Sequence, residues 1–281
     1  MSRWVVIGAG YTGARVAALL RARGDEVAVT RRTPERVEQA AVRTGARGVV
    51  IDLATATVED LTALIADGGP GATVVVTASP SDVDGAAEER VAEAAARAGA
   101  RRIVYVSSTG VYAAAHGEWV DEGFATAPVT ASGRARLAAE HGIASGPVEC
   151  VRLRAAGIHG PGRGAVERMR AGTFRVVGDG DTHVSRVHVD DLAAAVVLCG
   201  DARECGPVYN VADDEPCTTN ELVAEAVRTL GVAVPARVRL DEVGEDIAGM
   251  FTANRRVANG RLKRELGWVL KYPTWKTGTG P

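Results

Sequence analysis

A glycine-rich turn near the start of the chain has the residue types and spacing that bind a pyrophosphate. Residues 8–13 read Gly-Ala-Gly-Tyr-Thr-Gly and connect a short apolar run to a helical pattern. Gly8 permits a tight turn, and Gly10 lets the backbone approach the phosphates. Gly13 lets the helix pack closely on the strand. In this context the turn predicts a dinucleotide site rather than an ordinary glycine-rich connection.

Two neighbouring features indicate which dinucleotide binds. Tyr11 and Thr12 open the helix after the turn, where free N–H groups and the helix dipole favour an anion. The second apolar run ends in Arg31 and Arg32, where NAD sites usually carry an acidic residue for the ribose hydroxyls. Two guanidiniums suit a 2′-phosphate. We therefore predict NADP(H) as the cofactor, the alternative being that both arginines form a solvated basic turn.

Apolar runs alternate with helical patterns over the first 160 residues. The strand-like runs cover residues 4–7, 27–30, 48–53, 73–78, 102–107 and 148–153. Continuous apolar runs are typical of strands covered by helices on both faces of a parallel sheet. The repeating strand–helix order predicts an α/β fold with a doubly wound parallel sheet. Beyond residue 160 the pattern is less regular, although Thr218 and Glu221 fit a capping box that opens another helix.

Composition excludes several classes of partner. Hydrophobic residues make up 46% and charged residues 24% of the 281 residues, and the formal net charge is −2. These values predict a soluble globular protein without a nucleic-acid surface. No apolar run reaches ~20 residues, and four cysteines without a Cys-x-x-Cys pair favour reduced, buried thiols. We expect a cytoplasmic monomer or homodimer with no signal peptide, no metal site and no membrane contact, acting on a small molecule.

Several motifs together resemble those of the extended short-chain dehydrogenases/reductases. They lie at residues 8–13, 107–112, 158–163, 186–191 and 254–268. The resemblance implies a Rossmann fold of seven or so parallel strands with a small C-terminal substrate-binding lobe. On this basis we predict a dinucleotide-binding core of residues 1–160, to which 184–212 returns. Residues 161–183 and 213–281 would form the lobe.

The resemblance also exposes a gap at the catalytic positions. Residues 132–140 read Ser-Gly-Arg-Ala-Arg-Leu-Ala-Ala-Glu, where the family typically has Tyr-Gly-x-Ser-Lys-x-x-x-Glu. Ser132 stands at the tyrosine position and Arg136 at the lysine position, while Ser108 matches the family's catalytic Ser/Thr. All three lysines of the chain lie beyond residue 262, so a shifted alignment does not restore the pair. Among known members, the missing pair most resembles the atypical ketoreductases of angucyclinones, as in simocyclinone biosynthesis.

Family position assigns further cofactor contacts. Asp52 and Leu53 end the third strand, where adenine contacts usually lie. Thr77, Ala78 and Ser79 end the fourth strand, beside the ribose and pyrophosphate.

Other polar residues are weaker candidates. His116, in the loop after residue 112, is the one replacement acid that this loop offers, and His159 is expected to pack rather than to contact substrate. We expect Asp190 to cap the helix that follows it. Residues 244–251 are a candidate lid.

Three functions remain compatible with the missing pair. The protein reduces a ketone of an aromatic polyketide type, whose own neighbouring phenol supplies the proton in place of tyrosine. Arg136 cannot release a proton but can stabilise a developing oxyanion. Alternatively, the protein is a catalytically inactive NADP(H)-binding sensor. The third possibility, sugar-nucleotide epimerase or dehydratase chemistry, is disfavoured because the base is absent.

Overall fold

A seven-stranded parallel sheet forms the centre of the protein in the computed structural model, which describes residues 2–277. Neighbouring strands are β12 (Val208–Val211), β7 (Glu149–Ala155), β5 (Arg102–Ser108), β4 (Thr73–Val76), β1 (Arg3–Ile7), β2 (Glu26–Arg31) and β3 (Arg47–Val50), in this order. All six pairings are parallel. The predicted α/β fold with a doubly wound sheet is therefore confirmed. The sheet order changes direction at β1 and β4, and this reversal opens a crevice at the carboxyl ends of the strands.

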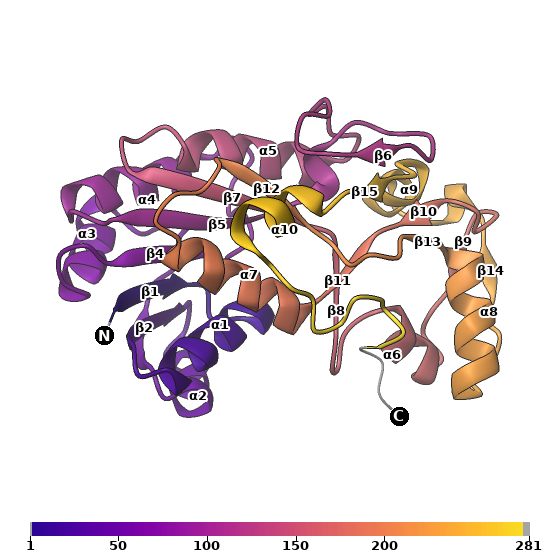
Figure 1. Ribbon diagram of the computed structural model, residues 1–281, viewed down its shortest axis with the longest axis horizontal. Coiled ribbons are helices and arrows are strands. Elements are labelled where there is room, and N and C mark those ends of the chain that lie inside the picture. The colour runs from indigo at the N-terminus through magenta and orange to yellow at the C-terminus, as the bar shows by residue number, and fades with distance from the viewer. Residues whose placement is uncertain (1, 278–281) are drawn as a thin grey trace.

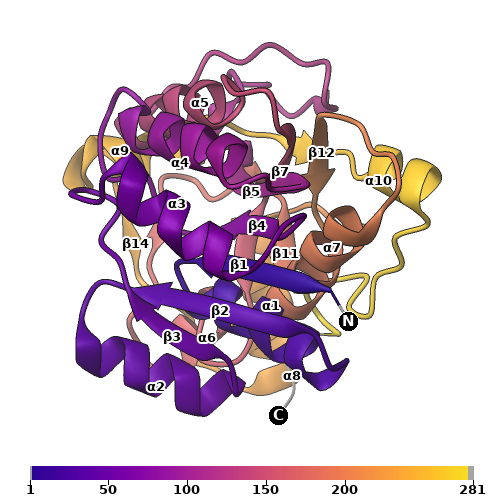
Figure 2. The same ribbon diagram turned by 90° about the vertical axis from the view of Figure 1, so that its left-hand side faces the viewer.

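Helices cover both faces of the sheet (Figures 1 and 2). One face carries α1 (Tyr11–Ala22), α2 (Pro34–Thr44), α7 (Val189–Asp201) and α10 (Gly260–Leu266). The other carries α3 (Val58–Asp67), α4 (Ala86–Arg97) and α5 (Ala131–Ile143). Successive strand residues point to opposite faces, so Val6 joins the first apolar layer while Val5 and Ile7 join the second. Both layers are fully buried at these positions, which explains why the strands read as continuous apolar runs.

A smaller region lies beyond one end of the sheet (Figure 1). It contains α6 (Ala165–Arg170), α8 (Thr219–Leu230) and α9 (Glu245–Thr252), with the short 3-10 helix η2 (Leu240–Glu242). Two short pairings, β9 (Val176–Val177) with β14 (Arg237–Val238) and β10 (His183–Val184) with β13 (Cys217–Thr218), also lie here. Thr218 and Glu221 form the predicted capping box of α8.

Two further pairings join this region to the sheet. They are β8 (Gly157–His159) with β11 (Arg186–His188), and β6 (Trp119–Val120) with β15 (Arg256–Val257). The 3-10 helix η1 (Thr109–Val111) extends β5 towards them.

The end of the chain does not stay in the small region. Leu262 of α10 and Trp268 are buried in the same apolar layer as β1 and α7, and α10 packs beside β12. The segment predicted as one lobe, residues 213–281, therefore returns in part to the sheet. The reason is the apolar face of α10, which can be buried only against a larger layer.

One other sequence-based expectation concerns the start of α7. The N-cap of α7 is His188, whose Nδ1 accepts a hydrogen bond from the Asp190 backbone N–H at 3.2 Å. The prediction that Asp190 is the N-cap is therefore wrong. Asp191 is buried instead, and it accepts backbone N–H bonds from Lys271 and Tyr272. This carboxylate thus ties the last described segment to the start of α7.

Candidate active site

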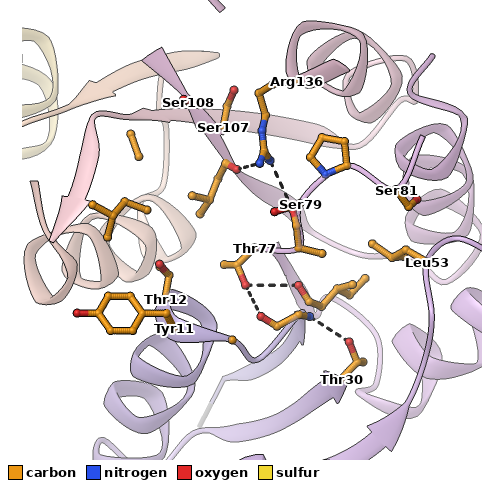
Figure 3. Close-up of a pocket in the computed structure, with 18 of the residues that line it drawn as sticks. Tyr11, Thr12, Thr30, Leu53, Thr77, Ser79, Ser81, Ser107, Ser108 and Arg136 are labelled. Carbon is orange, nitrogen blue, oxygen red and sulfur yellow. Dashed lines mark hydrogen bonds between the residues drawn. The ribbon is translucent and has the colours of Figure 1, made fainter. Parts of the chain in front are cut away.

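A large cavity of about 770 Å³ lies at the carboxyl ends of the parallel strands. Figure 3 shows it between the turn at Tyr11 and Thr12 and the side chain of Arg136. Eleven of the twelve residues predicted to bind the cofactor line it, and Gly13 is the exception. The eleven are Gly8, Gly10, Tyr11, Thr12, Arg31, Arg32, Asp52, Leu53, Thr77, Ala78 and Ser79.

The glycine-rich turn is built as its sequence requires. Gly8 has a φ of +97°, and a Cβ there would lie 2.7 Å from the Ala78 backbone nitrogen. A Cβ on Gly13 would lie 2.5 Å from both the Gly8 oxygen and the Thr77 Oγ1. Gly13 therefore acts by packing α1 against β1 and β4 rather than by facing the cavity. Thr30 Oγ1 accepts from the Gly8 N–H at 3.0 Å and fixes the turn from the next strand (Figure 3).

The first turn of α1 meets the requirements of a bound pyrophosphate. Its N-cap is Gly10, no side chain caps it, and no acidic residue lies in its first turn. The unpaired N–H groups and the positive end of the helix dipole thus face the cavity without a competing carboxylate. These observations fit a dinucleotide, with Gly8, Gly10 and Thr12 beside its phosphates.

Arginines gather at the adenosine end of this cavity. Arg31 lies close to the turn, because a Cβ on Gly10 would be 3.2 Å from its Nη1. Burial lowers the pKa of Arg31, and the charges of Arg36, Arg43 and Arg32 lower it further. Within residues 2–277, none of these four guanidiniums forms an ion pair with a carboxylate. The group therefore carries uncompensated positive charge.

A small cavity of about 250 Å³ adjoins the large one. Four residues line both: Ser108, Arg136, Ala156 and Gly157. The small cavity continues between α5, α9 and the segment from Asn254 to Val257. A group held in the large cavity can therefore meet a second molecule at Ser108 and Arg136.

Arg136 is held by neutral oxygen atoms. Its Nη1 donates to the Tyr105 hydroxyl at 3.0 Å and to the Val106 carbonyl at 3.2 Å. Burial raises the pKa of Tyr105, so this phenol stays protonated beneath the site. Among residues 2–277 no carboxylate forms an ion pair with this guanidinium, so its charge is available to a molecule in either cavity.

The other candidate catalytic residues lie in different surroundings. Ser132 lines the small cavity near the start of α5, where its Oγ lies 3.3 Å from Thr130 Oγ1. Asp246 of α9 accepts N–H bonds from Ala131 and Ser132 and so joins α9 to α5. His116 is exposed and lines neither cavity, so the structure does not bring this predicted acid into the site.

Sequence reasoning missed several polar residues of the small cavity, among them His183 and Arg255. Arg255 donates to the backbone carbonyls of Thr109, Tyr112 and Ala113, and burial lowers its pKa to about 10. The motif at residues 254–257 was the available signal, but nothing in its sequence indicated contact with the cavity.

His159 has a packing role, as expected. It is buried, its ring meets His188 edge to face with centroids 5.3 Å apart, and burial lowers its pKa to about 4. The four cysteines are unpaired, with Cys199 and Cys217 buried. Among residues 2–277, no helix combines the length and apolar character that a membrane crossing requires.

Known proteins resemble this chain along its whole length. Residues 8–199 match the family described as NAD(P)H-binding. Protein YeeZ of Escherichia coli (strain K12) is 30% identical, with 97% of each chain covered. The structure of a functionally unknown conserved protein from Silicibacter pomeroyi DSS is also 30% identical, with a TM-score of 0.83 over 99% of this chain and 96% of that one.

A more distant structure shares the fold alone. It is the UDP-glucose 4-epimerase of Thermus thermophilus in complex with NAD, which is 22% identical, with a TM-score of 0.78 over 98% of this chain and 96% of the epimerase. The chain belongs to the family described as NAD(P)H-binding. Its Rossmann core is an NAD(P)H-binding domain.

Proposed function

We propose that this protein is an NADP(H)-dependent oxidoreductase that reduces a compact ketone. The observation that carries the proposal is the wall shared by the two cavities, where Ser108 and Arg136 face both. When bound, a reduced nicotinamide supplies a hydride. A hydride donor in the large cavity and a carbonyl in the small cavity would therefore meet beside these two side chains.

The arginines at the other end of the large cavity support NADP(H) over NAD(H). Arg31 and Arg32 line the cavity, and Arg36 and Arg43 act on Arg31 electrostatically. A 2′-phosphate carries the charge that would compensate this group, and guanidiniums match its geometry. The adenosine ribose of NAD carries only hydroxyls at this position, and hydroxyls would not neutralise the positive charge of the arginines.

Arg136 and Ser108 have separate tasks at the carbonyl. The positive charge of Arg136 stabilises negative charge that develops on the carbonyl oxygen. Arg136 cannot supply the proton, because a guanidinium does not deprotonate in proteins. The hydroxyl of Ser108 can donate a hydrogen bond and orient the carbonyl. The proton for the carbonyl oxygen therefore has to come from another side chain or from the substrate.

The size of the small cavity limits the ketone. Its volume of about 250 Å³ lies below the ~300 Å³ at which ligand pockets usually begin. This favours a ketone of one or two rings over an extended aromatic polyketide. An aryl ketone with a neighbouring phenol, as the sequence suggested, remains within this class. Sugar-nucleotide epimerisation has only the shared fold in its favour.

Hydride transfer is tested with purified protein, NADPH and a panel of aryl and cyclic ketones. The panel includes ortho-hydroxyacetophenone and its methyl ether, and NADPH fluorescence reports both binding and consumption. We expect NADPH to bind more tightly than NADH and to be consumed with at least one ketone. Tight NADPH binding without consumption by any ketone would contradict the proposal and support a sensor.

A further inference from the structure

One histidine among the residues that line the small cavity has no role in the proposal so far. His183 belongs to β10 and is partly buried. Its backbone N–H donates to Asn254 Oδ1 at 2.8 Å, and its carbonyl accepts from the Arg255 N–H at 3.3 Å. Asn254 and Arg255 line the same cavity. The position of His183 is thus fixed by the segment that closes the cavity.

The hydrogen bond at Nδ1 determines which ring nitrogen can exchange a proton. Asn254 Oδ1 lies 3.3 Å from His183 Nδ1. An amide oxygen only accepts hydrogen bonds, so this contact favours the form of the ring that carries a hydrogen on Nδ1. The second nitrogen, Nε2, is therefore the one that gains and loses a proton.

Asn254 is itself held in place. Its φ of +42° lies in the left-handed region, which asparagine tolerates better than most residues. Its carbonyl accepts from the Gly117 N–H at 2.8 Å. The amide that orients the imidazole is therefore anchored from a separate loop.

Charged groups from several elements surround this ring. Glu221 of α8 interacts with it electrostatically: hydrogen bonds from Thr218 lower the Glu221 pKa most, and His183 and Arg256 lower it further. Arg255 lines the cavity from the segment before β15, and Arg136 lines it from α5.

We propose that His183 is the proton donor for the ketone oxygen, taking over the task of the absent tyrosine. This inference rests on the proposed reductase function. When bound, a reduced nicotinamide would supply the hydride to the carbonyl carbon and would itself be oxidised, and the C=O π pair would move to oxygen. That oxygen forms an O–H bond with the proton of His183 Nε2, whose N–H bond breaks. The neutral imidazole then recovers a proton from solvent.

This assignment differs from a proton supplied by a substrate phenol. An imidazole exchanges protons near neutral pH, whereas a serine hydroxyl such as that of Ser132 does not. If His183 donates the proton, a ketone without any phenol is still reduced. If the phenol donates it, methylating the phenol stops reduction.

The first experiment measures the His183→Gln variant with the fastest ketone of the panel. We expect kcat to fall by ~10²-fold or more, since general acid catalysis contributes ~10²–10⁴-fold. His116→Gln is the matched control, because that histidine is exposed and lines neither cavity. NADPH affinity and thermal unfolding are measured in parallel and should be unchanged in both variants.

The pH profile separates a titrating group from a structural one. The donor must be protonated, so the wild-type kcat should fall as pH rises, and His183→Gln should lose this dependence. Asn254→Asp places a carboxylate beside Nδ1, which stabilises the charged ring and should move the fall by ~1 or more pH units upward. Nitrogen-15 NMR of the imidazole should show the same upward shift without any turnover.

The outcomes distinguish the inference from the proposed function. If no ketone consumes NADPH, both fail. If wild type reduces a ketone and His183→Gln is equally fast, only the role of His183 is wrong. Reduction of ortho-hydroxyacetophenone but not of its methyl ether by wild type would assign the proton to the substrate. Reduction of both, with a larger loss for the ether in His183→Gln, would support His183.

Discussion

The large and small cavities differ in how the chain builds them. Most of the predicted cofactor contacts in the large cavity lie at or just after the ends of β1, β2, β3 and β4, so they read as short local motifs. The small cavity draws on η1, α5, β10 and the segment from Asn254 to Val257, which lie far apart in the sequence. A cofactor site made from strand ends can be recognised locally, whereas a substrate site made from distant loops cannot.

The two sites also rely on different chemical groups. The turn at Gly8 and Gly10 offers backbone N–H groups, whose directions follow from the fold itself. The small cavity depends on individual side chains such as Ser132, His183 and Arg255. Substitutions should therefore affect the two cavities differently, and the following measurements test that difference.

The largest effect is expected at a buried ion pair of α5, next to Ser107 of the large cavity. Buried Glu140 of α5 accepts from Ser107 Oγ at 2.5 Å and from Arg154 Nη2 at 2.7 Å. Glu140→Ala leaves the Arg154 guanidinium buried without its partner, which should cost ~3–5 kcal/mol of unfolding free energy. NADPH binding in the large cavity and ketone reduction at the small cavity should both decrease. Urea unfolding measures the loss of unfolding free energy.

The control for Glu140 is Glu93→Ala, which removes an exposed i,i+4 pair with Arg97. Surface pairs of this kind contribute ~0–1 kcal/mol. A similarly small loss for Glu140→Ala would show that α5 is not held by this buried pair.

Glu88 should give a pH-dependent effect. Its side chain is fully buried with neither oxygen hydrogen-bonded, and burial followed by the Asp82 charge raises its pKa to about 7. Since the folded pKa is above the unfolded one, the stability contribution is complete below pH ~4.5 and is lost as pH rises through ~7. Glu88→Gln should therefore gain up to about 3 kcal/mol relative to wild type between these limits. The same difference in unfolding free energy between Glu88→Gln and wild type at pH ~4.5 and at pH ~7 would contradict this.

The cofactor cavity is tested at its arginines. Replacing Arg31 and Arg32 by alanine should weaken NADPH by ~1.5–3 kcal/mol, the usual range for charge-assisted hydrogen bonds, while NADH changes little. Dissociation constants from fluorescence titration measure both. Arg237→Ala, an exposed change in the small region, is the control. Equal losses for NADPH and NADH would remove the assignment of a 2′-phosphate site.

The smallest effect is expected at Ser132. Its hydroxyl contacts Thr130 and it lies at the exposed start of α5. Ser132→Ala should reduce kcat by less than ~10-fold, whereas a true general acid would lose ~10²-fold or more. Steady-state turnover at saturating NADPH decides between them, and a large loss would make Ser132 the proton donor instead of His183.

The positions of the strands and the residues of the large cavity could be predicted because they depend on local patterns. The runs at residues 4–7 and 27–30 became β1 and β2, and Gly8 and Gly10 face the cavity as their spacing indicated. Strand ends were less accurate, since the run at residues 73–78 ends as strand at Val76. An apolar run in the sequence indicates which residues are buried. Burial continues past the last residue that is hydrogen-bonded in the sheet, so the run is longer than the strand.

The sequence was sufficient for the fold class, the NAD(P)H-binding family and the residues around the glycine-rich turn, because parallel strands bring their carboxyl ends to one edge. Only the tertiary structure placed His183 in the small cavity and left His116 outside it. It also returned Leu262 to the core. These positions depend on contacts between segments that are distant in the sequence. The hydrogen bond between His183 and Asn254, for example, joins residues 71 positions apart. A local sequence pattern cannot predict such a contact.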